Sequence, residues 1–281
     1  MKKQRLDKLL VELNLCTSRQ LAQRLIQAGE VQVNHQVIDK VGTEVALDAL
    51  IELQYRPPYV SRGGEKLAKA LAEFGVSVTD RICLDGGIST GGFTDCLFQA
   101  GAKQVYGVDV GYGQVDWKIR TDDRLVLRER VNLRHLTAAD LYAADAVRPD
   151  LGVVDVSFIS LDKVLPALWE LLVAPRELVL LVKPQFEVGR EAIGKKGVVR
   201  DPVAQAGAIE QVLSAAQSLG WQYRGLTFSP LTGPAGNIEY LLWLSMASLK
   251  VAPTLKEIRE IVDLAQQTLT KSKPAIPSSE S

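Results

Sequence analysis

Hydrophobic and polar residues follow two helical patterns and then a strand-like pattern over the first fifty positions. Leucines recur on one helical face over residues 5–15, and a second helix is predicted after it, with Thr17 or Ser18 as its N-cap. Apolar and polar residues then alternate over residues 31–45, which predicts short strands. These elements together predict a small α+β domain over residues 1–54.

A linker is predicted over residues 55–61, where prolines interrupt both patterns, and strands alternate with helices after it. The predicted strands are apolar runs that end at an acidic or turn-forming segment: RICLD (81–85), QVYGVDV (104–110), LGVVDV (151–156) and LVLLV (178–182). Helical segments lie around residues 64–75, 91–100, 162–173 and 203–219. Such alternation is typical of a mostly parallel sheet with helices on both faces.

The last two predicted strands, WQYRGLTFS and NIEYLLWLS, are joined by PLTGPAG, which is too short for a crossover helix. They therefore predict an antiparallel hairpin at the end of an α/β domain that spans residues 62–249. Residues 250–281 complete the chain, with an amphipathic helix in TLKEIREIVDLAQQTLT and a tail, KSKPAIPSSES, that we expect to be disordered.

Composition narrows the class of protein. Lys and Arg together number 33, as do Asp and Glu, so the net charge of zero favours no polyanionic partner. Three cysteines without a CxxC pair and two histidines argue against a metal site and fit a reducing cytosol. The charged N-terminus lacks the apolar core of a signal peptide, and the longest apolar run near the end covers only about half of a membrane span. We therefore expect a soluble cytoplasmic protein without a metal or a membrane partner.

A glycine-rich turn, in ICLDGGISTGGFTDCLFQAG, follows the first predicted strand of the α/β domain. Its glycines leave room for the backbone to approach a ligand, but their spacing matches neither GxGxxG nor GxxxxGK[ST]. Asp109 ends the next strand, where a carboxylate binds a ribose diol. The arrangement suits S-adenosylmethionine, with Asp85 near the positively charged methionine end. In the alternative interpretation, the glycines only shape a tight turn between the strand and the helix. The candidate cofactor-binding residues are Asp85, Gly87, Ser89, Thr90, Gly91, Gly92 and Asp109.

Four other charged residues follow or flank the predicted strands. Asp155 and Lys183 each end an apolar strand, so both are expected at the edge of the sheet where α/β proteins bind ligands. Lys66 lies in SRGGEKL, and Glu239 lies in GNIEYLLW just after the final turn. Taken singly, Lys66 and Glu239 have the sequence context of ordinary surface charges.

Five segments, SRGGEKL, LDGGISTGGFTD, VDVSFISL, VKPQFE and GNIEYLLWL, together resemble the TlyA family of ribosomal RNA 2′-O-methyltransferases, whose members are often named hemolysins. The resemblance implies a Rossmann-like class I methyltransferase domain with a seven-stranded sheet, preceded by the small RNA-binding domain named after ribosomal protein S4. It also implies S-adenosylmethionine as cofactor and cytidine in ribosomal RNA or ribosomal subunits as substrate. The catalytic Lys-Asp-Lys-Glu tetrad of the family falls on Lys66, Asp155, Lys183 and Glu239.

Methyl transfer to a ribose hydroxyl requires an aligned oxygen and a group that handles its proton. We expect Lys183 to orient the 2′-oxygen and to accept or relay the proton. Lys66 is expected to steady the ribose or an adjacent phosphate, while Asp155 and Glu239 fix the lysines and the hydroxyl.

The N-terminal 25 residues contain six Lys or Arg and two acids, which indicates a cationic face for RNA phosphates. We expect the segment PQFEVGREAIGKKGVVR to help cover the target near the active site. The candidate RNA-binding residues are Arg5, Lys8, Arg19, Arg24 and Arg62.

Three other functions remain open. DVSF is similar to the Asp/Asn-Pro-Pro-aromatic loop of amino-group methyltransferases without its two prolines, so methylation of an RNA base ranks second. A pore-forming cytolysin is suggested only by the hemolysin name. An RNA-binding factor with an unused cofactor pocket is the third alternative.

Overall fold

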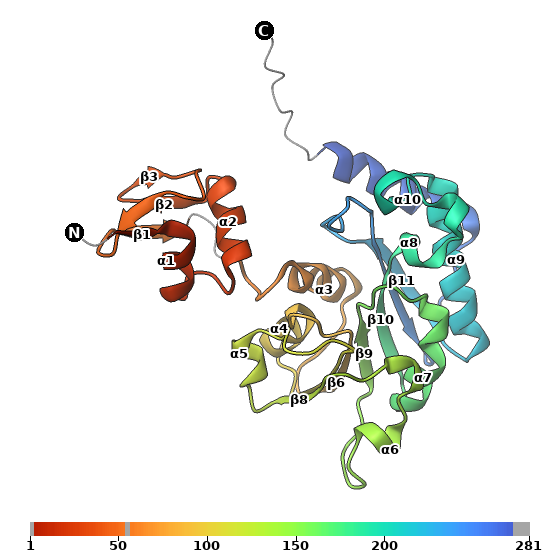
Figure 1. Ribbon diagram of the computed structural model, residues 1–281. Helices are drawn as coiled ribbons and strands as arrows, with labels where there is room; N and C mark the ends of the chain where they lie inside the picture. The colour runs from red at the N-terminus through yellow and green to blue at the C-terminus, as the bar shows by residue number, and fades with distance from the viewer. Residues whose placement is uncertain (1–2, 54–56, 272–281) are drawn as a thin grey trace. The chain divides into compact units, whose positions relative to one another are not determined.

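The computed structural model describes residues 3–53 and 57–271, without the side chains of residues 195, 270 and 271. The chain divides into two compact units, Met1–Val60 and Ser61–Ser281 (Figure 1). Residues 55–56 of the predicted linker and nearly all of the predicted disordered tail, from residue 272 on, lie outside the described residues.

The first unit contains both predicted helices, α1 (Leu6–Glu12) and α2 (Arg19–Gln27), and Ser18 caps α2 by accepting a hydrogen bond from the Leu21 amide at 3.2 Å. Their apolar faces share one core with the strands. Antiparallel pairing joins β1 (Lys3–Arg5) to β4 (Glu44–Ala46), and joins β2 (Val31–Val33) to both β3 (Gln36–Val37) and β5 (Ile51–Leu53). The alternating pattern predicted strands only between residues 31 and 45, so it missed β1 and β5.

The second unit is built on a seven-stranded sheet with the strand order β11-β12-β10-β9-β6-β7-β8. The strands are β6 (Ile82–Gly86), β7 (Gln104–Val108), β8 (Leu125–Arg128), β9 (Leu151–Val154), β10 (Glu177–Val182), β11 (Gln222–Phe228) and β12 (Tyr240–Ser245). The strands from β10 to β8 are parallel, whereas β12 runs antiparallel to both of its neighbours. This topology confirms the predicted mostly parallel sheet with an antiparallel terminal hairpin. The sequence pattern had not identified β8.

Helices cover both faces of this sheet (Figure 1). The two long helices α9 (Pro202–Ser218) and α10 (Leu255–Lys271) pack together on one face with α7 (Leu165–Leu171), and α3 (Arg62–Phe74) packs against α4 (Gly92–Gln99) on the other. Three further helices have only four residues each: α5 (Trp117–Arg120), α6 (Ala138–Leu141) and α8 (Pro184–Glu187). The helix predicted over residues 162–173 is divided in two, because a 3₁₀ turn over Leu161–Lys163 precedes α7.

The order of the strands reverses beside β6, since β7 and β8 lie on one side of it and β9 lies on the other. In open α/β sheets such a reversal leaves a crevice at the carboxyl ends of the strands, where ligands bind. A ligand site is therefore expected among the residues at the carboxyl ends of β6, β7, β9 and β10.

Candidate active site

Lys183 comes directly after the apolar strand β10, and Asp155 comes directly after the neighbouring strand β9. The Lys183 ammonium nitrogen lies 2.5 Å from Asp155 Oδ1, and it donates a hydrogen bond to the Ser157 hydroxyl at 2.8 Å. Only 8% of Lys183 is exposed. A buried ammonium is costly unless it is paired and hydrogen-bonded, and here the segment that follows the adjacent strand β9 supplies both partners. The lysine is thus compatible with a strand that is buried along its length.

A second buried ion pair joins Lys66 to Glu239. Lys66 lies on α3 and Glu239 immediately precedes β12, and the Lys66 ammonium donates a hydrogen bond to Glu239 Oε2 at 2.6 Å. The exposed fractions are 8% for Lys66 and 2% for Glu239. The expectation that these two residues are ordinary surface charges is therefore wrong. Each charge can be buried because the other lies beside it, although 173 residues separate them in the chain.

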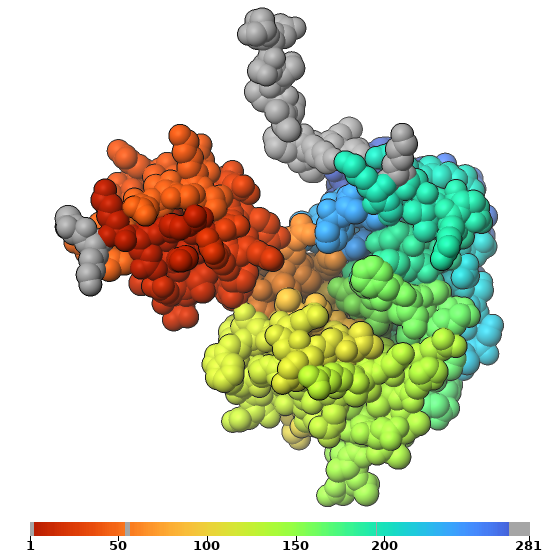
Figure 2. Space-filling model, in the orientation of Figure 1, coloured from red at the N-terminus to blue at the C-terminus, as the bar shows by residue number. Residues whose placement is uncertain are grey.

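The two pairs lie at the same edge of the sheet. In the register of β10 and β12, Val182 pairs with Tyr240, so Lys183 and Glu239 are the residues next to this pair at the end of the two strands. The Asp155 amide donates a hydrogen bond at 3.0 Å to the carbonyl of Gly86, the last residue of β6. In Figure 2, segments from the middle (green) and the end (blue) of the second unit adjoin on the face in view.

The glycine turn lies against this edge and has little space for side chains. Gly87 has a φ of +88°, and a Cβ atom at this position would lie 2.6 Å from the Asp155 carbonyl oxygen. Gly91, with a φ of +93°, is the N-cap of α4 and provides no side-chain hydrogen bond. The local sequence would allow Thr90 or Thr94 to cap this helix, but Thr94 lies inside it and donates to Asp85 Oδ2 at 2.6 Å. The turn therefore exposes backbone where a ligand can approach closely.

Asp85 is the residue before the last one of β6, and it is completely buried. Thr94 hydrogen-bonds to its Oδ2, whereas its Oδ1 is buried without a hydrogen-bond partner among the described residues. Burial raises the pKa of Asp85 to about 7, and the negative charges of Asp155 and Asp109 add to this effect. A carboxylate in this state fits a cationic ligand, which would satisfy the free oxygen and favour ionisation.

Asp109 follows β7 and faces a pocket of about 320 Å³. Its carboxylate accepts hydrogen bonds from the amides of Ser89 (2.8 Å) and Gly111 (2.7 Å), so it is held in place at the rim of the glycine turn. The wall of the pocket includes four predicted site residues, Gly87, Ser89, Asp109 and Asp155. The neighbouring apolar wall is formed by Val108, Val131, Leu133, Val156, Ile159 and Val164.

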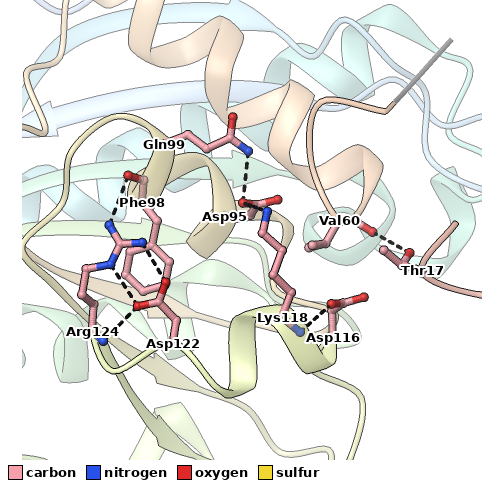
Figure 3. Close-up of polar contacts among 9 residues, drawn as sticks. All are labelled: Thr17, Val60, Asp95, Phe98, Gln99, Asp116, Lys118, Asp122 and Arg124. Carbon is pink, nitrogen blue, oxygen red and sulfur yellow. Dashed lines mark hydrogen bonds and ion pairs between the residues drawn. The ribbon is translucent and has the colours of Figure 1, made fainter. Parts of the chain in front are cut away.

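Short helix α5 is linked to α4, the helix after the glycine turn, by the contact between Lys118 and Asp95 (Figure 3). Asp95 on α4 accepts hydrogen bonds from Gln99 at 3.1 Å and from Lys118 at 3.3 Å. Asp116 caps α5, and its amide donates to the Thr90 carbonyl at 3.1 Å. These contacts fix Thr90 through its backbone. Among the predicted cofactor-binding residues, Asp85, Thr90, Gly91 and Gly92 are not part of the described pocket wall.

Comparisons with known proteins show the family to which the chain belongs. The family model described as FtsJ-like methyltransferase matches residues 59–246, and the model described as S4 domain matches residues 4–51. The chain belongs to the FtsJ-like methyltransferases. Its membership in the TlyA group of that family, as the sequence motifs indicated, is supported by close relatives.

"Putative rRNA methyltransferase YqxC" of Bacillus subtilis is 48% identical and aligns over 98% of this chain and 99% of its own length. "16S/23S rRNA (cytidine-2'-O)-methyltransferase TlyA" of Mycobacterium tuberculosis is 46% identical over 85% of this chain and 89% of its own length. A solved structure, "Putative hemolysin from Streptococcus thermophilus", is 42% identical, with a TM-score of 0.76 over 96% of this chain and 98% of that one.

Two groups in this FtsJ-like domain were missed by the sequence analysis. Ser157 was noticed only as part of DVSF, yet its hydroxyl contacts Lys183. Glu187 on α8 is buried, and it accepts hydrogen bonds from the Ser160 hydroxyl (2.5 Å) and the Leu161 amide (3.0 Å). These hydrogen bonds connect α8, which begins directly after Lys183, to the loop that contains Ser157. The position of Glu187 in VKPQFE, four residues after Lys183, was the available signal.

The predicted RNA-binding residues occupy both units. Arg5, Lys8, Arg19 and Arg24 lie on or next to the helices of the S4 domain, and Arg62 begins α3 of the methyltransferase domain. Lys8, Arg19, Arg24 and Arg62 are exposed, and Arg5 is partly buried. Arg5 and Arg19 both contact one carboxylate, that of Asp7.

Within residues 3–53 and 57–271, no group of three or more His, Cys, Asp or Glu side chains is arranged to hold a metal ion. None of the helices described is both long and apolar enough to cross a membrane.

Proposed function

We propose that this chain transfers a methyl group from S-adenosylmethionine to a ribose 2′-hydroxyl of ribosomal RNA. The observation that carries the proposal is the pair of buried lysine–carboxylate contacts, Lys183–Asp155 and Lys66–Glu239, at the sheet edge beside the glycine turn. The target is inferred to be a cytidine, because the relative from Mycobacterium tuberculosis is named for cytidine. The substrate would place the protein in the cytoplasm.

The residues around the glycine turn fit this cofactor. The unpartnered Oδ1 of Asp85 suits the ammonium of the methionine moiety, Gly87 admits a ligand close to the backbone, and Asp109 suits the ribose hydroxyls. Ser89 belongs to the same pocket wall, and Gly91 and Gly92 begin the helix behind it. When bound, S-adenosylmethionine supplies a methyl group that is already activated by its sulfonium charge.

The two lysine–carboxylate pairs supply the groups that the methyl acceptor needs. A ribose hydroxyl is a poor nucleophile near neutral pH, so its oxygen has to be aligned and its proton removed. We assign alignment of the oxygen and acceptance of its proton to Lys183, which Asp155 and Ser157 hold at a defined position. The ammonium first gives up a proton to solvent, and the neutral amine then takes the hydroxyl proton as the oxygen bonds to the methyl carbon and the bond from sulfur to that carbon breaks. The ammonium that results remains next to the Asp155 carboxylate. Lys66, fixed by Glu239, is assigned to the ribose or its neighbouring phosphate.

The test compares Lys183→Ala with the wild-type chain on ribosomal subunits from cells that lack the protein. Nucleoside mass analysis of digested RNA identifies the product, and calorimetry measures the affinity for S-adenosylmethionine. We expect a ribose-methylated nucleoside from the wild type, and a rate at least about 100-fold lower from the variant with the cofactor affinity retained.

Exposed Lys163, which is paired with Asp162, provides the matched control through Lys163→Ala. Unchanged methyl transfer by Lys183→Ala would remove Lys183 from the mechanism. A methylated base in place of a methylated ribose would support the second candidate, an RNA base methyltransferase. Absence of cofactor binding by the wild type would support an RNA-binding factor.

A further inference from the structure

The buried carboxylate of Glu187 is not among the four charged residues to which the proposed mechanism gives a role. Glu187 is the last residue of α8, which begins directly after Lys183, and only 8% of it is exposed. It accepts hydrogen bonds from the Ser160 hydroxyl at 2.5 Å and from the Leu161 amide at 3.0 Å. Burial raises the pKa of Glu187, and these two hydrogen bonds act in the opposite direction. A buried acid thus holds one particular loop.

The loop held by Glu187 is attached to the segment after β10 at two points. Residues 155–161 and 183–187 follow the neighbouring parallel strands β9 and β10. Near the start of the two segments, Ser157 accepts a hydrogen bond from Lys183 at 2.8 Å, and at their ends Glu187 accepts its two hydrogen bonds. The hydroxyl of Ser157 is therefore fixed relative to the lysine by the strands on one side and by Glu187 on the other.

The ammonium of Lys183 has three N–H donors. Asp155 Oδ1 lies 2.5 Å from its nitrogen, and the Ser157 hydroxyl accepts a second donor. Within the part of the chain that the structure describes, Lys183 has no third hydrogen-bond or ion-pair partner. After the loss of one proton, the amine retains two N–H groups, which these two acceptors satisfy. Its lone pair then takes the third direction, in which the proton of a hydroxyl can be accepted.

We propose that Ser157 is a positioning residue, held in place by Glu187, that aims the lone pair of Lys183 at the 2′-hydroxyl of the target ribose. This inference rests on the proposed function, because it assigns a direction to the base of that reaction. Ser157 is exposed, so its O–H group can donate to water while its oxygen accepts from the lysine.

The same contact stabilises the transition state more than the ground state. As the O–H bond of the ribose breaks and an N–H bond forms, Lys183 becomes an ammonium. Its hydrogen bond to Ser157 thereby becomes charge-assisted and stronger. An interaction that strengthens only as the reaction proceeds raises kcat and leaves substrate affinity nearly unchanged.

A purely structural role for these contacts, in which they only stabilise the fold around α8, makes a different prediction. Independent effects of two substitutions on the rate multiply, whereas the effects of residues that act through one another do not. If Glu187 acts through Ser157, the substitution Glu187→Gln has little effect on turnover once the Ser157 hydroxyl is absent.

The experiment measures turnover by the full chain on ribosomal subunits from cells that lack the protein, at saturating S-adenosylmethionine. We expect Ser157→Ala to lower kcat about tenfold, the loss of one hydrogen bond to a charged group, and to leave KM for the subunits within about twofold of the wild type. Ser157→Thr keeps the hydroxyl and should recover most of the rate. Because Ser157 also belongs to the pocket wall, calorimetry verifies that the cofactor affinity is retained.

Glu187→Gln retains one carbonyl oxygen as acceptor, so by itself it should lower kcat about threefold. In the Ser157→Ala background the same change should lower kcat less than about twofold, whereas independent effects would give a total loss of about 30-fold. Ser218→Ala and Glu210→Gln, at exposed positions of α9, are the matched controls and should leave kcat unchanged.

Thermal unfolding verifies that each variant is folded; if Glu187→Gln is not, Ser160→Ala, which removes one donor to Glu187, replaces it in the double variant. Three results would overturn the positioning role while the proposed function stands: wild-type kcat in Ser157→Ala, no recovery in Ser157→Thr, or a loss in the double variant equal to the product of the single losses. Absence of a methylated ribose with the wild type, or full activity of Lys183→Ala, would overturn the proposed function and this inference with it.

Discussion

Replacement of Asp85 by Asn tests the electrostatic account of the cofactor site, because the change removes a buried ionisable group and keeps its shape. Burial raises the pKa of this carboxyl from 3.8 to about 7. The folded chain therefore holds the proton more tightly than the unfolded chain, and stability decreases as the pH rises from about 4 to about 7. At pH 8 ionised Asp85 lowers the free energy of unfolding by about 4 kcal/mol.

The Asp85→Asn variant has no carboxyl group at this position, so the decrease in the free energy of unfolding that ionisation of Asp85 causes does not occur in it. The side-chain amide of the variant can still accept the hydrogen bond from Thr94. Its NH₂ group takes the place of Oδ1, which has no described hydrogen-bond partner, and this unpaired donor lowers the free energy of unfolding by about 1–3 kcal/mol at every pH. The pH-dependent part of the difference remains. Relative to the wild type, the free energy of unfolding of Asp85→Asn should be higher at pH 8 than at pH 5 by about 2.5 kcal/mol.

Urea denaturation of the cofactor-free proteins at the two pH values measures this difference, with Asp123→Asn, at an exposed position, as the control. Calorimetry at pH 8 should show that Asp85→Asn binds S-adenosylmethionine at least about tenfold more weakly, since the charge partner of the ammonium is lost. A stability difference that is the same at pH 5 and pH 8 would refute the raised pKa. Unchanged cofactor affinity would refute the assigned contact.

Three further perturbations address the rest of the structure. Gly87→Ala brings a Cβ atom to 2.6 Å from the Asp155 carbonyl oxygen at a φ of +88°, so it should weaken cofactor binding and lower thermal stability. The control is Gly75→Ala, at a φ of +70° with no atom within 4 Å, and it should lower thermal stability less. Equal losses of thermal stability in the two variants would contradict the close approach. Glu239→Gln should lower the free energy of unfolding by about 3 kcal/mol, because Lys66 stays buried without its charge partner, and wild-type stability in urea would argue against that pairing. Deletion of residues 1–58 should abolish methylation of ribosomal subunits and leave calorimetric affinity for S-adenosylmethionine nearly unchanged, whereas parallel loss of both would contradict separate roles for the two domains.

Much of the fold follows from local patterns in the sequence. Apolar runs that end at Asp85, Asp155 and Lys183 alternate with helical segments, and parallel strands bring their carboxyl ends to one edge, so the position of the crevice could be predicted. The strand β8 could not, because its four residues, LVLR, lie at the edge of the sheet and only partly buried, which leaves a weak periodic signal. The turn chemistry was also ambiguous, since nothing in the sequence distinguishes Thr94 as a cap from Thr94 as a donor to Asp85.

What the sequence determined by itself was the kind of residue available at each strand end and the family motifs in which those residues occur. Only the tertiary structure decided which charges are partners. Lys66 and Glu239 meet across 173 residues, and Arg5 and Arg19 meet on a completely buried Asp7, so the local neighbours of these residues predict neither burial nor pairing. The physical reason is that a charged group can be buried only where its counter-charge and hydrogen-bond partners lie beside it. Tertiary packing, and not the local sequence, determines which groups lie side by side.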